Sequence, residues 1–146
     1  FFYPQWQRDL SLITKLLKPG GVLVISFRSQ YFNALCIARQ GLWENVEMLL
    51  SKRHGRVFGG PVEFTWQQSG EIRELFSSRV DLDLLDLVGI GCCSGIPGDP
   101  HDVICRPSKL GSNEREMLNA IECAIGQSVP DAGRYMLAIA QKQQER

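Results

Sequence analysis

The chain has 146 residues, of which 44% are apolar and 22% charged, so it can bury a core of its own. Sixteen basic and sixteen acidic side chains balance, which argues against nucleic acid or an anionic membrane as a partner. Five cysteines without a paired spacing argue against a disulfide framework and favour a cytoplasmic setting. The apolar runs are too short to cross a bilayer, and neither a membrane span nor a signal peptide is expected.

The first half of the chain predicts a helix, a buried strand and two further helices. Apolar residues recur at helical spacing over Pro4–Lys18, and a Pro-Gly-Gly turn ends that helix. Val22–Ile25 is apolar at every position, which is typical of a strand covered on both faces. Two shorter helices are expected over Gln30–Arg39 and around Trp43 to Leu50. The glycine-rich segment Gly55–Gln68 is expected to be irregular.

Another helix and a half-exposed strand are expected next. The pattern over Ser69–Ser78 predicts a short helix with Ser69 as its cap. Val80–Val88 alternates between polar and apolar residues until the pattern shifts at Leu84-Leu85. This segment therefore predicts an edge or near-edge strand with a bulge. A long loop is expected over Gly89–Gly111, and loops of this length are usually functional or mobile.

The C-terminal part predicts one amphipathic helix and one central strand. Asn113 and Glu116 form a capping-box pattern ahead of the helix, which is expected to end at Gly126. Arg134–Gln141 is apolar on both faces, so this last strand is expected in the middle of a sheet. Three strands cannot give two neighbours to both this strand and Val22–Ile25. The sequence therefore predicts that a neighbouring strand is missing.

The order of these segments resembles the second half of class I S-adenosylmethionine-dependent methyltransferases. LLKPGGVLVISF at positions 16–27 is similar to the helix end, turn and fifth strand of that family. FTWQQSGEIRELFSS and DLDLLDLVGIG resemble the short helix before the sixth strand and the strand itself. GRYMLAIAQK resembles the last strand, which commonly ends with a basic residue.

The resemblance implies the C-terminal half of a Rossmann-like α/β fold. Its three strands would lie in the order 5-7-6, with the last strand antiparallel and helices on the flanks. Residues 1–146 would form one part of a single methyltransferase domain, with a helical insertion at about residues 29–54. Similar insertions occur in members that act on small molecules or on sugar-linked intermediates.

The family's cofactor-binding motifs are not found in this sequence. The family holds S-adenosylmethionine through a glycine-rich turn after its first strand and an acidic residue after its second. Glycines let the backbone approach the cofactor, and a carboxylate accepts hydrogen bonds from the ribose hydroxyls. Gly89-Ile90-Gly91 follows a strand but leads into cysteines, glycines and prolines. The chain by itself is therefore not expected to bind S-adenosylmethionine.

The resemblance also implies where a methyl acceptor would bind. Ligands of open α/β sheets lie outside the carboxyl ends of the strands. The residues at that end of Val22–Ile25 are Ser26, Phe27, Arg28, Gln30 and Tyr31. Arg28 is a candidate to hold an anionic group, and Tyr31 to stack on the acceptor. In the alternative interpretation, Ser29 only caps the next helix and Arg28 is solvated.

Other groups of reactive residues give weaker patterns. Cys92, Cys93, His101 and Cys105 suggest zinc ligands, but adjacent cysteines rarely bind one ion, so no metal site is expected. No spacing supports a cysteine–histidine nucleophile, and no general base can be assigned. The aspartates Asp81, Asp83 and Asp86 are expected on a solvated strand face. The tryptophans Trp6, Trp43 and Trp66 are expected to pack in the core or between helices.

The leading hypothesis is methyl transfer to a small-molecule acceptor, with this chain supplying the acceptor side. In such an enzyme the fold positions the acceptor atom, and proximity provides most of the catalysis. The alternative is a non-catalytic remnant or interaction domain that pairs through an exposed strand edge. Two assemblies are considered for this chain: a homo-oligomer, and a complex with a complementing N-terminal polypeptide.

Overall fold

A three-stranded sheet in the order β1-β5-β4 forms the centre of the fold. The fold comes from a computed structural model that describes residues 6–56, 61–95 and 105–144. The strands are β1 (Val22–Arg28), β4 (Leu82–Ile90) and β5 (Tyr135–Lys142), and β5 runs antiparallel to both neighbours. β1 and β4 therefore point the same way. The prediction that the last strand is central is confirmed, as is the edge position of β4.

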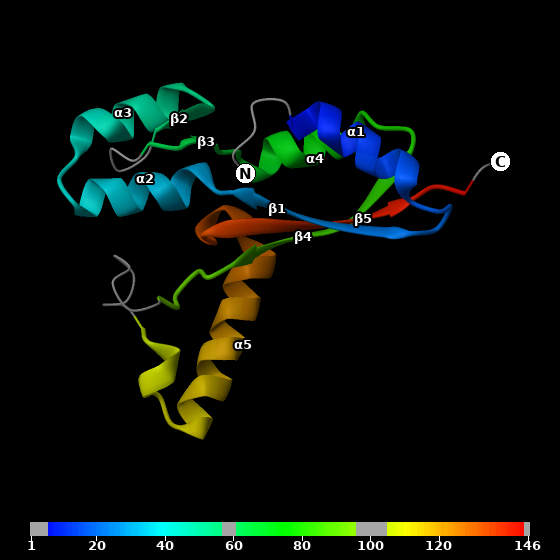
Figure 1. Cartoon of the computed structure of the whole chain (residues 1–146). Helices are drawn as coiled ribbons and strands as arrows, with labels where there is room; N and C mark the ends of the chain where they lie inside the picture. Colours follow the sequence, from blue (N-terminus) through cyan, green and yellow to red (C-terminus); the bar gives the residue numbers. More distant parts are fainter. Residues whose placement is uncertain (1–5, 57–60, 96–104, 145–146) are drawn as a thin grey trace.

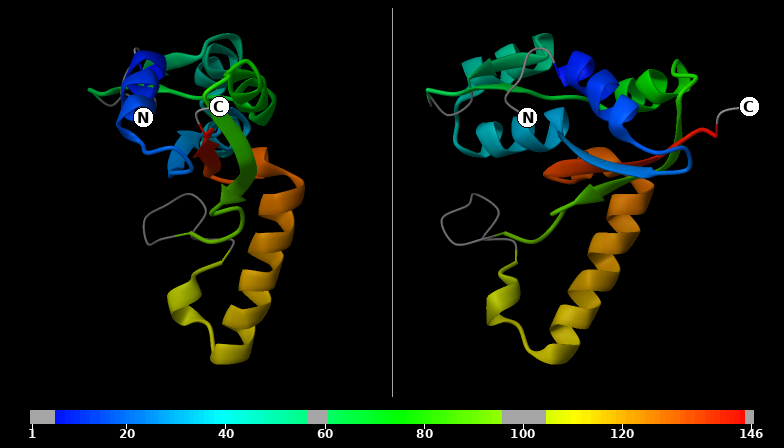
Figure 2. Two further views of the ribbon diagram at one scale, coloured as in Figure 1. Left: turned by 90° about the vertical axis from the view of Figure 1, so that its right-hand side faces the viewer. Right: turned by 45° about the vertical axis from the view of Figure 1, so that its right-hand side comes forward.

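Two helices cover one face of this sheet, and a third leaves the opposite side. Figure 1 shows α1 and α4 above the strands, while α5 extends away below them. The second view in Figure 2 also shows α5 projecting from the sheet. None of the helices in the described ranges could span a membrane. The helices are α1 (Trp6–Leu16), α2 (Gln30–Arg39), α3 (Trp43–Ser51), α4 (Ser69–Ser77) and α5 (Ser112–Ser128), with 3-10 turns η1 (Pro107–Lys109) and η2 (Pro130–Ala132).

The main core lies between the sheet and the two covering helices. Alternate residues of β5 point into it, because successive side chains of a strand face opposite sides. Leu10 of α1 and Phe76 of α4 meet them from the helix side. The buried members of this cluster are Leu10, Phe27, Ile72, Phe76, Leu82, Leu87, Met136, Ala138 and Ala140.

The prediction that Val22–Ile25 is covered on both faces is wrong for the described residues. Val22 and Val24 are 51% and 56% exposed, while the intervening Leu23 packs against the core. The two valines lie on the face opposite α1 and α4, where the described residues place nothing over them. β1 is also an edge strand, since β5 is its one neighbour within the sheet. One face and most of one edge of β1 are therefore open.

The segment expected to be irregular contains a small hairpin instead. β2 (His54–Arg56) pairs antiparallel with β3 (Glu63–Thr65). The chain then passes beside the end of β1, where the backbone N–H of Gln67 donates to the Arg28 carbonyl at 2.9 Å. A buried cluster of Ala34, Ile37, Leu49 and Trp66 joins this hairpin region to α2 and α3. Sequence periodicity could not indicate the hairpin because each strand has only three residues.

Helix ends differ from the predicted ones in three places. α4 begins after Gln68, whose backbone amide donates to the Glu71 carboxylate at 2.8 Å, so Ser69 is not its cap. The start of α5 is capped by Glu114, whose carboxylate accepts from the Gly111 backbone N–H at 2.8 Å. The predicted capping box of Asn113 and Glu116 is therefore not the one observed. α5 also continues past Gly126 to Ser128. The predicted bulge in β4 is confirmed by the register shift between Leu84 and Asp86.

Candidate functional site

The predicted acceptor residues do not all lie together. Ser26, Phe27 and Arg28 line a hollow of about 290 Å³ beside the edge of β1. Gln30 is completely buried in the first turn of α2, and Tyr31 is 46% exposed. Neither lines this hollow or the larger one beside it. The structure thus groups the three strand residues and separates the two helix residues from them.

Arg28 is partly buried, and neighbouring side chains hold it. Its Nε donates to Asn33 Oδ1 at 2.9 Å, and its guanidinium lies 4.5 Å from the centre of the Phe64 ring. Burial lowers the pKa of Arg28 from its ordinary value. Arg28 stays a cation at neutral pH because its ordinary pKa lies far above 7. The alternative interpretation is correct on one point, since Ser29 Oγ does cap α2 by accepting from the Phe32 amide at 3.2 Å.

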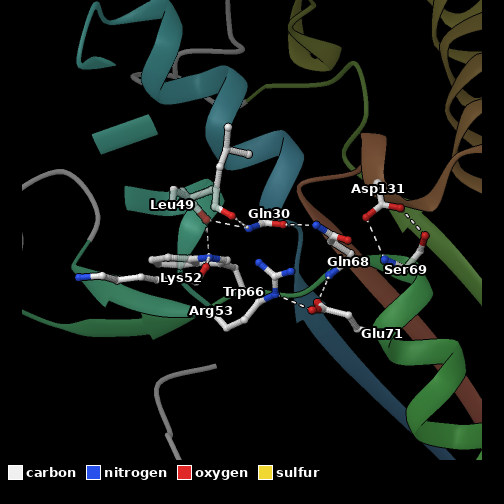
Figure 3. A network of polar contacts seen from close by, with 10 residues as sticks. Gln30, Leu49, Lys52, Arg53, Trp66, Gln68, Ser69, Glu71 and Asp131 are labelled. Carbon is white, nitrogen blue, oxygen red and sulfur yellow. Dashed lines mark hydrogen bonds and ion pairs between the residues drawn. The ribbon is translucent and has the colours of Figure 1, made fainter. Parts of the chain in front are cut away.

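Gln30 joins α2 to the end of α3 and to the residue that precedes α4. Its Nε2 donates to the Leu49 carbonyl at 2.7 Å, and its Oε1 accepts from Gln68 Nε2 at 2.6 Å. Figure 3 shows Gln30 bridging these two groups, with Trp66 donating to the same Leu49 carbonyl at 3.0 Å. A buried amide with these partners has a structural role. The expectation that Gln30 binds the acceptor therefore has no support from its position.

A second hollow, which sequence reasoning missed, lies next to the first. It has a volume of about 350 Å³ and lies between the first turn of α1, the β2–β3 hairpin and α4. Trp6, Thr65 and Gln67 line both hollows. The apolar part of its lining is Trp6, Trp66, Ile72 and Leu75, and the polar part is Gln7, Arg53, His54, Glu63, Thr65, Gln67 and Glu71. A cavity of this size that combines apolar walls with polar groups is typical of small-molecule sites.

The ionisable residues of this larger hollow form two side-chain pairs. Arg53 Nε lies 2.5 Å from Glu71 Oε1, and His54 Nδ1 lies 2.7 Å from Glu63 Oε1. All four side chains are more than a third exposed, so each pair adds about 1 kcal/mol or less to stability. They give the hollow a polar rim whose ionisable groups already have partners.

The cysteine loop is held by a carboxylate. The backbone amides of Cys92, Cys93 and Ser94 donate to Glu122 of α5 at 2.7, 2.9 and 2.6 Å. Burial opposes ionisation of Glu122, but these hydrogen bonds outweigh burial and hold its pKa below the usual value. Burial, followed by the nearby Glu122 charge, raises the pKa of the Cys92 thiol to about 11. Cys92 is thus protonated at neutral pH and is a poor nucleophile.

Nothing within the described ranges forms a cluster of three or more metal-binding side chains. His101 lies outside those ranges, as do the other residues of the stretch 96–104 in the predicted long loop. Asp81 is paired with Arg79 Nη2 at 2.6 Å, and Asp83 accepts from Gln143 Nε2 at 2.9 Å. The two aspartates therefore have structural partners at the sheet surface.

The tryptophans differ from the expectation in one case. Trp66 is fully buried, and Trp6 packs edge-to-face on Phe27 with a centroid distance of 5.3 Å. Trp43 is 67% exposed and is not a core residue.

No family model matches this sequence, and no curated protein matches it significantly. The geometry of the chain is therefore the basis for any assignment of function.

Proposed function

We propose that this chain forms the acceptor-side half of an S-adenosylmethionine-dependent methyltransferase that acts on a small molecule. The observation that carries the proposal is the sheet, in which the last strand lies antiparallel between two strands that are parallel to each other. This arrangement agrees with the 5-7-6 order implied by the resemblance to that family. The smaller hollow follows the edge of β1 from Val24 to Arg28 and so reaches the carboxyl end of the strand, which agrees with the expected place of a ligand.

The described residues do not fit the cofactor itself. Glu63 and Glu71, the carboxylates at the hollows, are already paired with His54 and Arg53. The residue that follows β1 is Ser29, which caps α2 and does not begin a glycine-rich turn. In the proposed enzyme the cofactor is held by a polypeptide segment outside the present sequence. This chain binds and orients the acceptor, and proximity supplies most of its catalytic effect.

The test of this proposal reads the gene ahead of Phe1 and joins the chain to any coding segment found there. A glycine-rich turn after one strand and an acidic residue after the next are expected in that segment. The joined protein is expected to transfer the labelled methyl group of S-adenosylmethionine to a small-molecule acceptor, whereas each half alone is not. Isothermal titration calorimetry of this chain with S-adenosylmethionine should show no binding. Tight binding by the chain alone, or a joined protein without transferase activity, would contradict the proposal.

A second candidate function is protein association through β1. The exposure of Val22 and Val24 on an edge strand favours it, because unpaired backbone groups beside apolar side chains form a template for another strand. This candidate predicts that the mean mass in light scattering rises with concentration and that the joined protein has no transferase activity. A chain that stays monomeric at every concentration tested would rule out self-association.

A further inference from the structure

We infer that the larger hollow binds an uncharged aromatic molecule that carries a hydroxyl group, with Gln67 as the partner of that hydroxyl. The inference rests on the proposed function only where it identifies this molecule as the methyl acceptor. Binding itself requires no cofactor, so it can be tested on the chain alone.

Gln67 is the residue that points to a ligand. It is 8% exposed, and its backbone is fixed by the bonds to Arg28 and to the Gln30 amide, at 2.9 and 3.0 Å. Among the described residues, no hydrogen bond engages its side-chain amide, which lines both hollows. Its amide atoms are not among the fully buried side-chain atoms without a partner in the described part of the chain, so they face the open space of the hollows, where a ligand can reach them. An amide both donates and accepts, which matches the two capacities of a hydroxyl group.

One indole ring favours a flat ligand. Trp6 is partly exposed, lines both hollows and packs edge-to-face on Phe27 with a centroid distance of 5.3 Å. Trp66 is fully buried and supports the hollow from behind without offering area to a ligand. Figure 3 shows its Nε1 held by the carbonyls of Leu49 and Lys52, at 3.0 and 2.6 Å. A partly exposed indole ring packs well against another ring.

The ionisable groups of the rim disfavour a charged ligand because they already have partners. Arg53 is paired with Glu71, and Glu63 lies 2.7 Å from His54 Nδ1. Of the described lining residues, no other has an ionisable side chain. A charged ligand entering the hollow would lose hydration and would have to displace one of these partners to gain a counter-charge. A neutral ring does not have this cost, and its hydroxyl group can reach the amide.

The test compares three probes on the unmodified chain by isothermal titration calorimetry at pH 7. The probes are 2-naphthol, which is neutral, naphthalene-2-sulfonate, which is an anion, and 2-methylnaphthalene, which lacks the hydroxyl. We expect saturable 1:1 binding of 2-naphthol, about tenfold weaker binding of 2-methylnaphthalene, and the weakest binding for the sulfonate. No saturable binding of 2-naphthol, or tighter binding of the sulfonate, would overturn the inference.

A variant then assigns the hydroxyl contact to one side chain. Gln67→Leu is expected to weaken 2-naphthol about tenfold and to leave 2-methylnaphthalene unchanged, which general damage to the fold could not do. Gln40→Leu, an exposed glutamine at the end of α2, is the matched control and should change neither. Equal weakening of both probes by Gln67→Leu would contradict the assignment.

The two proposals fail separately. If methyl transfer fails in the joined protein while 2-naphthol still binds this chain, the proposed function is wrong and the binding inference holds. If methyl transfer succeeds while no neutral aromatic probe binds, the inference is wrong and the function holds.

Discussion

Single residues show how far a sequence pattern can locate a site. Ser26, Phe27 and Arg28 follow a recognisable strand, and they do line a hollow at its end. Gln30 and Tyr31 come next in the chain, but the first turn of α2 directs one into the interior and leaves the other exposed. The rotation of a helix by about 100° per residue separates neighbours in sequence. Proximity along the chain was therefore a poor guide once the strand had ended.

Replacement of Gln30 should destabilise the chain strongly. In Gln30→Ala the Leu49 carbonyl and the Gln68 amide lose a partner inside the protein, and a small cavity is left. We expect the free energy of unfolding to fall by about 2 to 3 kcal/mol. Urea denaturation followed by circular dichroism measures this change. Gln127→Ala, at an exposed position of α5, is the control and should stay within about 0.5 kcal/mol of the native chain.

At the level of elements, three glycines allow α5 and η2 to reach the sheet. A Cβ atom at Gly126 would overlap the carbonyl oxygen of Gly89, and one at Gly89 would lie 2.6 Å from the Pro130 carbonyl oxygen. A Cβ at Gly133 would come within 2.5 Å of the Ile90 amide nitrogen. Gly126 was expected to end its helix, as glycines often do. It instead lies inside α5, where close backbone contact with β4 requires it.

A pair of glycine substitutions separates close contact from helix propensity. Gly126→Ala should lower the free energy of unfolding by about 2 kcal/mol or more, because the contact with Gly89 outweighs the better helix propensity of alanine. In Gly70→Ala, within α4, the added Cβ meets no atom within 4 Å, so the free energy of unfolding should rise by about 0.5 kcal/mol. Thermal and urea unfolding of both variants test this contrast. A stabilising Gly126→Ala would show that α5 does not approach β4 as described.

For the whole molecule, the distribution of apolar surface is uneven. The face of the sheet under α1 and α4 is closed, while the opposite face of β1 exposes Val22 and Val24. Adjacent exposed apolar side chains on an edge strand favour contact with another polypeptide segment. Both candidate functions place a polypeptide against this region, either a cofactor-binding segment or another chain.

A charge on the open strand should reduce association. Val24→Lys places an ammonium group on the edge strand, where lysine discourages pairing with another strand. We expect a lower mean mass in light scattering at high protein concentration. Val80→Lys is the control, because Val80 is 88% exposed but lies before β4, outside any strand. An equal effect of the two variants would indicate general solubility and not strand pairing.

The sequence by itself determined which segments form most of the helices and long strands, because these depend on a periodicity that neighbouring residues carry. It also indicated that β5 is central, since its two faces are both apolar. Only the tertiary structure decided the short hairpin, the helix caps and the hollow between Trp6, Trp66 and Gln67. Trp6 and Gln67 are far apart in the chain, and no local pattern could pair them. Such contacts form only when the whole chain packs, and the candidate site depends on them.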